Sequence, residues 1–110
     1  MTATVSPKDA ALWLASGEAV LIDVREPDEF RAEHIACAAS IPLNSLGDAL
    51  GGTQIPAARK MIFQCLKGGR SHQVCAFVGP TAAQGQPVFN LTGGIQAWHA
   101  AGLPVIFADR

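Results

Sequence analysis

The chain has 110 residues, of which 49% are hydrophobic and 15% charged, and its formal net charge is −1. This composition suits one folded domain over residues 1–110, and the lack of a basic run argues against nucleic acid as the main partner. No apolar run approaches the roughly 20 residues of a membrane span, and the N-terminus lacks the basic and apolar regions of a secretory signal. We therefore expect a soluble, cytoplasmic protein with no membrane contact.

Short apolar runs alternate with helical segments along the chain. Ser6 is a typical N-cap, and Pro7 follows it at the first position of a helix that Gly17 ends. A second helix begins at Pro27, and we expect it to end at His34 and Ile35. Further helices are predicted after Ser71, as far as Gly79–Pro80, and over 95–101. A buried strand is predicted at 19–23, and further strands are predicted at 38–41, 61–64 and 88–91.

This alternation predicts an α/β fold with a mainly parallel sheet flanked by helices on both faces. Residues 44–59 are the least readable part of the chain. A helical turn over 46–50 is compatible with their pattern, but Gly51, Gly52 and Pro56 break any longer element. We expect this segment to run over the surface.

The three cysteines, Cys37, Cys65 and Cys75, form no CxxC pair. Their odd number argues against a disulfide framework, and the histidines do not have the spacing of zinc ligands, so no metal is expected. Cys37 lies among alanines and Cys75 lies in an apolar helical segment. We expect both to be buried and unreactive.

Cys65 differs because it ends a predicted strand and begins a glycine-rich turn. The turn, Leu66, Lys67, Gly68, Gly69 and Arg70, leads through Ser71 into a predicted helix. Glycines let the backbone curl so that several N–H groups point inward, and a helix N-terminus adds partial positive charge. Both effects favour the thiolate, which is the reactive form of cysteine. The turn is therefore predicted to be an anion-binding site with a nucleophile in it.

Asp23, Arg25 and His34 are the other candidate site residues. Asp23 and Arg25 lie at the carboxyl end of a predicted parallel strand, where α/β folds place their sites. They could act as a catalytic acid and an anion clamp, but we favour an ion pair that fixes the loops. His34 could be a general base for Cys65, although a hydrogen bond that anchors a loop is the preferred interpretation.

Three functions fit a thiolate among backbone donors. Cys65 could accept a sulfane sulfur from an anionic donor, hold it as a persulfide and pass it to a thiophilic acceptor. It could serve a cysteine phosphatase, or the domain could be a non-catalytic binding or regulatory module. Phosphatase loops place five residues between cysteine and arginine, whereas four separate Cys65 from Arg70. The shorter loop favours a single sulfur over a phosphate, and the cations beside Cys65 argue against a module without chemistry.

Three motifs in order resemble the rhodanese family, the thiosulfate sulfurtransferases, and in particular its single-domain members. The motifs are residues 21–30 with 34–35 and 41–42, then Cys65, Gly68, Arg70 and Ser71, then 91–95 with Trp98 and 101–104. The match covers nearly the whole chain. Three motifs at plausible spacing are far more specific than any one of them.

The resemblance implies a thiosulfate sulfurtransferase that works through a covalent persulfide on Cys65 without a separate cofactor. The donor would be a small anion such as thiosulfate, and the acceptor would be cyanide, a thiol or a protein. The backbone from Leu66 to Arg70 would surround the outer sulfur, Lys67 and Arg70 would attract the donor, and Asp23 and Arg25 would be mainly structural. The sequence departs from the family pattern at Glu33, at 36–38 and at the helix break of Gly79–Pro80. The break could alter packing behind the loop and the choice of acceptor.

Overall fold

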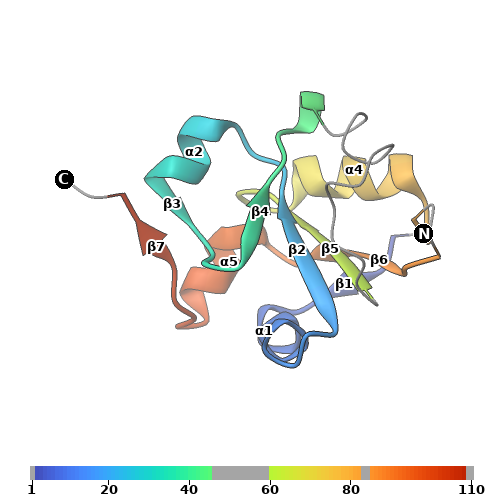
Figure 1. The fold of residues 1–110 in the computed structure, drawn as a ribbon, viewed down its shortest axis with the longest axis horizontal. Coiled ribbons are helices and arrows are strands. Elements are labelled where there is room, and N and C mark those ends of the chain that lie inside the picture. Colours follow the sequence, from blue (N-terminus) through green and yellow to red (C-terminus); the bar gives the residue numbers. More distant parts are fainter. Residues whose placement is uncertain (1, 46–59, 83–84, 109–110) are drawn as a thin grey trace.

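The fold was analysed in a computed structural model, which describes residues 2–45, 60–82 and 85–108. Five parallel strands form the main sheet in the order β1-β6-β5-β2-β4 (Figure 1). Their bounds are Thr4–Val5 (β1), Val88–Leu91 (β6), Lys60–Gln64 (β5), Ala19–Asp23 (β2) and Ala38–Ser40 (β4). A second, antiparallel pair consists of β3 (Glu33–His34) and β7 (Ile106–Phe107).

Helices cover both faces of the main sheet (Figure 1). Their bounds are Pro7–Ala15 (α1), Pro27–Ala32 (α2), Gly69–Val78 (α4) and Gly94–Ala100 (α5), and a 3-10 turn spans Leu43–Ser45. Helix α4 packs on β5 and β6, whereas α1 and α5 contact each other on the opposite face. The predicted α/β fold is thereby confirmed. None of the described helices is long and apolar enough to cross a membrane.

The alternation of side chains along the strands creates one core on each face of the sheet. In β5, Met61 and Phe63 belong to the core that includes Val74 and Cys75 of α4. Ile62, between them, belongs to the other core, with Ile95 and Trp98 of α5 among its members. Because β5 is the central strand, both its faces are covered, and this explains its continuous apolar sequence.

Local sequence signals set the helix starts as expected. Ser6 Oγ accepts a hydrogen bond from the Asp9 N–H at 3.2 Å and caps α1. Helix α2 begins at Pro27 with a capping box in which Glu29 accepts from the Glu26 N–H at 3.1 Å. Helix α4 ends at Val78, before Gly79, whose φ of 92° is in the left-handed region. The predicted break at Gly79–Pro80 is confirmed.

Two predictions from sequence are wrong. Helix α2 ends at Ala32, not at His34 and Ile35, because Glu33 is extended and pairs with Phe107 in the small sheet. Cys37 is exposed, not buried, because it lies in the turn between Ile35 and β4. The helical turn predicted over 46–50 lies outside the described residues.

Candidate active site

Cys65 directly follows β5, so the central strand delivers its thiol to the carboxyl edge of the sheet. The chain then turns through Leu66 and Lys67 to Gly68, which has a φ of 107° and is the N-cap of α4. Helix α4 begins at Gly69, so Arg70 and Ser71 lie in its first turn. The structure therefore combines the cysteine, the glycine turn and the helix N-terminus in the order the sequence predicts.

The sulfur of Cys65 is surrounded by hydrogen-bond donors. The Gly68 N–H lies 3.1 Å from Sγ, and the backbone N–H and hydroxyl of Ser71 each lie 3.4 Å from it. Burial raises the pKa of the Cys65 thiol, but hydrogen bonds from Ser71 and from the Gly68 and Lys67 N–H groups outweigh it and leave the pKa below its usual value. This geometry stabilises a thiolate.

Asn90 of β6 orients the Ser71 hydroxyl. The Asn90 side chain donates through Nδ2 to the Gly68 carbonyl at 3.2 Å, so its Oδ1 faces Ser71, with Oγ at 2.6 Å. A hydroxyl has one proton, and Ser71 can donate it to Asn90 Oδ1, to Cys65 Sγ or to the Gly68 carbonyl oxygen, which lies 3.3 Å away. Ser71 can thus bond Asn90 while Cys65 is a thiol and turn to the sulfur once the thiolate forms.

The backbone under Cys65 is held from several sides. The Cys65 carbonyl accepts from the Ile95 N–H at 2.9 Å and from Gln64 Nε2 at 3.0 Å, and the Leu66 carbonyl accepts from the Gln96 N–H at 3.1 Å. Gly94 makes this close approach possible, since a Cβ there would lie 2.4 Å from the Cys65 carbonyl oxygen. The N-terminal turn of α5 therefore supports the loop from beneath.

The two cations of the loop have different surroundings. The Arg70 guanidinium forms a two-pronged ion pair with Glu29 of α2, at 2.7 and 3.0 Å. This pair, opposed by burial, holds the pKa of Glu29 at about 2. Lys67 is exposed, and within 2–45, 60–82 and 85–108 its side chain makes no ion pair or hydrogen bond.

Asp23 and Arg25 form the expected ion pair below the loops. Both side chains are buried, Arg25 Nη2 lies 2.8 Å from Asp23 Oδ2, and the same nitrogen donates to the Glu33 carbonyl at 2.7 Å. His34 stacks on the Phe30 ring, and its Nδ1 lies 2.9 Å from the Phe30 carbonyl oxygen. All three residues have partners outside the cysteine loop, which agrees with the supporting roles preferred from sequence.

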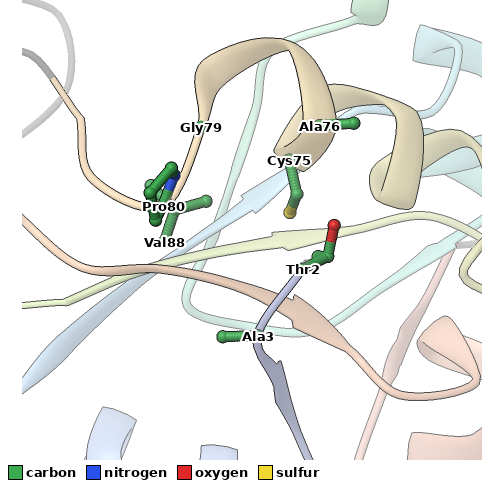
Figure 2. Close-up of a pocket in the computed structure, with 7 residues that line it drawn as sticks. All are labelled: Thr2, Ala3, Cys75, Ala76, Gly79, Pro80 and Val88. Carbon is green, nitrogen blue, oxygen red and sulfur yellow. The ribbon is translucent and has the colours of Figure 1, made fainter.

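Two pockets differ in their relation to the loop. A groove of about 340 Å³ adjoins it and is lined by Arg25, Glu29, Ala32, Glu33, Leu66 and Phe107. A second pocket, of about 200 Å³, is shown in Figure 2 and is lined by Thr2, Ala3, Cys75, Ala76, Gly79, Pro80 and Val88. The Cys75 side chain points from α4 toward Thr2 in this pocket. Burial raises the pKa of the Cys75 thiol to about 11. Cys75 therefore stays protonated near neutral pH.

Sequence reasoning did not single out Glu29, Asn90 or Gly94 as parts of the site. Asn90 carried a signal, because it is a polar residue inside an otherwise apolar strand and is 6% exposed. Glu29 and Gly94 belong to motifs quoted for the family resemblance, but their contacts join segments far apart in the chain. Only the fold brings Glu29 to Arg70 and Gly94 to Cys65.

Comparison with known proteins identifies the family to which the chain belongs. The family model described as Rhodanese-like domain matches residues 6–101. The chain is 34% identical over 90 residues to a sulfurtransferase of Allochromatium vinosum, covering 81% of this chain and 79% of the relative. It is 32% identical over 97 residues to thiosulfate sulfurtransferase GlpE of Ectopseudomonas mendocina, covering 87% of this chain and 84% of the relative. The chain belongs to the rhodanese-like domain family.

The fold is also shared with a solved structure, that of a thiosulfate sulfurtransferase from Pseudomonas aeruginosa. The two superpose with a TM-score of 0.85 at 28% identity, over 98% of this chain and 20% of the other. A Synechocystis relative of uncharacterised function is 33% identical over 105 residues, which are 94% of this chain and 55% of the relative. The chain thus spans little more than half of that relative's length.

Proposed function

We propose that the domain is a sulfurtransferase in which Cys65 carries the transferred sulfur as a persulfide. The observation that carries the proposal is the set of donors around Cys65 Sγ, namely two backbone N–H groups and the Ser71 hydroxyl within 3.1–3.4 Å. These donors favour the attacking thiolate, and the same loop can stabilise the negative charge of a terminal sulfur. The sulfurtransferase names of two relatives support the same reaction class.

In the first half-reaction, the Cys65 thiolate attacks the outer sulfur of a small anionic donor such as thiosulfate. A new S–S bond forms to Cys65, the S–S bond of thiosulfate breaks, and sulfite leaves with the electron pair. Sulfite is a stable anion, so no acid is needed to protonate the leaving group. The loop backbone from Leu66 to Arg70 and the Ser71 hydroxyl would surround the outer sulfur.

In the second half-reaction, a thiophilic acceptor attacks that outer sulfur. Cyanide would bond to the outer sulfur and form thiocyanate, whereas the thiolate of a small thiol or of a protein would bond to it and form a persulfide. In each case the electron pair of the broken S–S bond returns to Cys65, and the donors around Sγ stabilise the restored thiolate. No metal or other cofactor enters either step.

Two alternatives have less support. A cysteine phosphatase needs a loop wide enough for phosphate, but here four residues separate Cys65 from Arg70, and the Gly68 N–H lies only 3.1 Å from the sulfur. Arg70 is also paired with Glu29, and the carboxylate cancels part of the positive charge that Arg70 would offer a phosphate. A non-catalytic module would not require a thiol with a lowered pKa.

The test compares the wild type with Cys65→Ser in thiosulfate:cyanide transfer, with an aryl phosphate as a second substrate. We expect transfer by the wild type, none by Cys65→Ser at unchanged thermal stability, and phosphate hydrolysis at background. Unchanged transfer by Cys65→Ser would refute the mechanism, and hydrolysis well above background would favour the phosphatase. Lack of turnover with several donors, together with a stable protein complex, would favour the binding module.

A further inference from the structure

The Glu29 carboxylate faces the active loop but does not touch the nucleophile. Its two oxygens contact the two terminal nitrogens of Arg70, at 2.7 and 3.0 Å, so the guanidinium and the carboxylate are matched edge to edge. The Glu29 and Arg70 side chains are 32% and 37% exposed. The ion pair therefore lies at the rim of the site, where approaching ions experience its charge.

A paired guanidinium attracts an anion much less than a free one, because the carboxylate beside it cancels most of its field beyond a few ångströms. Arg25 is likewise paired, with Asp23. Of the cations that the structure describes near the loop, Lys67 alone has a side chain without such a partner. The sequence predicts that Lys67 and Arg70 both attract the donor, but in the structure only Arg70 of these two residues is paired with a carboxylate.

We propose that Glu29 is a specificity-determining positioning residue: by neutralising Arg70, it leaves Lys67 as the cation that attracts the anionic donor and limits the positive potential at Cys65. This inference rests on the proposed sulfurtransferase function and names a further residue that governs it. Glu29 acts through Arg70 and fixes the first turn of α4 against α2. Its removal should make the site more attractive to anions, not less.

Glu29→Gln is the informative substitution. Glutamine keeps a carbonyl oxygen that can accept from the Glu26 N–H, so the cap of α2 is retained, while the negative charge is lost. The double variant Glu29→Gln/Arg70→Gln restores the original net charge at the rim. Lys67→Gln removes the exposed cation without touching a buried contact. Asp28→Asn is the matched control, because Asp28 is on the same helix, is 92% exposed and pairs with Arg31.

The experiment measures how fast Cys65 reacts with iodoacetate, an anion, and with iodoacetamide, its neutral counterpart, at low salt. In both reactions the thiolate forms an S–C bond and iodide leaves. The ratio of the two rates reports the local potential, because the fraction of thiolate cancels. Alkylation is followed on the peptide that contains Cys65, and exposed Cys37 in the same protein is the internal reference.

We expect the iodoacetate-to-iodoacetamide ratio to rise about two- to fivefold in Glu29→Gln and to fall by a similar factor in Lys67→Gln. It should equal the wild-type ratio in the double variant and in Asp28→Asn, and all differences should shrink at high salt. An unchanged ratio in Glu29→Gln would overturn the inference. A lower ratio in the double variant than in the wild type would overturn it as well, because it would mean that Arg70 attracts anions even while it is paired with Glu29. If Glu29→Gln fails to fold, an unchanged ratio in Lys67→Gln overturns it equally.

Turnover extends the test to the proposed donor. The KM for thiosulfate should fall in Glu29→Gln and rise in Lys67→Gln, with a weaker salt dependence in the latter. The alkylation ratios do not require sulfur transfer. Predicted ratios without any persulfide would therefore refute the proposed function alone, and persulfide formation with unchanged ratios would refute the role of Glu29 alone.

Discussion

The Ser71 hydroxyl offers the sharpest test of how the loop activates its cysteine. Ser71→Ala removes the one side-chain donor to Cys65 Sγ among the described residues and leaves the backbone donors in place. It also leaves Asn90 Oδ1 without the Ser71 hydroxyl. The substitution should therefore raise the pKa of Cys65 and cost some stability.

The size of the effect follows from the geometry. Hydrogen bonds to charged groups contribute about 1.5–3 kcal/mol. The 3.4 Å separation and the competition from Asn90 place this one at the low end, near about 1.5 kcal/mol. About 1.4 kcal/mol corresponds to a factor of ten, so at pH well below the midpoint the fraction of Cys65 present as thiolate should fall about tenfold. The loss of the donor to buried Asn90 should cost about 1–3 kcal/mol of unfolding free energy.

The assay is the pH dependence of iodoacetamide alkylation, read on the peptide that contains Cys65. In Ser71→Ala the midpoint should move to higher pH, and at pH well above the midpoint the rate should be no lower than that of the wild type, because a more basic thiolate is more nucleophilic. Ser16→Ala is the matched control, because the hydroxyl of this exposed serine also makes more than one hydrogen bond, to the Trp13 carbonyl and the Glu18 carboxylate, but is not part of the loop. An unchanged midpoint in Ser71→Ala would refute the idea that this hydroxyl stabilises the thiolate.

Three further substitutions test the support around the loop. Gly94→Ala places a Cβ 2.4 Å from the Cys65 carbonyl oxygen and should lower the free energy of unfolding in urea by about 3 kcal/mol. Gly102→Ala is the control, because the space around Gly102 is open, and it should cost about 1 kcal/mol. Equal losses in the two variants would contradict the close approach at Gly94. Arg25→Met leaves the buried Asp23 carboxylate without its ion-pair partner and should lower the free energy of unfolding by about 3–5 kcal/mol. Adding Asp23→Asn should restore much of that stability, and no recovery in the double variant would contradict the pairing. Because the pKa of Glu29 is lowered to about 2, its contribution is present above pH 4.5 and is lost as the pH falls through 2. The stability gap between wild type and Glu29→Gln, about 1 kcal/mol at this partly exposed site, should therefore close over that range; a gap constant with pH would contradict the ion pair.

The sequence predicted the features of this fold that depend on neighbours along the chain. Ser6–Pro7 and Pro27 specify helix starts through capping and a fixed φ, and the apolar run before Cys65 specifies a strand. The order from strand through Cys65 and glycines to a helix made the donors around the Cys65 sulfur predictable, because they are local to residues 65–71.

Features that depend on distant partners were not predictable in this way. The small sheet of β3 and β7 joins Glu33 to Phe107 across the chain, so the early end of α2 has no local signal. The same holds for Asn90, which bonds Ser71 from another strand, and for Glu29, which reaches Arg70 from another helix. Exposure of Cys37 depends on what packs around its turn, and its alanine neighbours do not reveal that.

The most direct test of the central claim is the mass of the protein after incubation with thiosulfate, followed by mapping of the modified peptide. We predict a gain of one sulfur atom, about 32 Da, on Cys65, and its loss on addition of cyanide. Cys75, whose pKa is raised to about 11, and exposed Cys37 should remain unmodified. Sulfur on Cys75 or Cys37 in place of Cys65 would contradict the account.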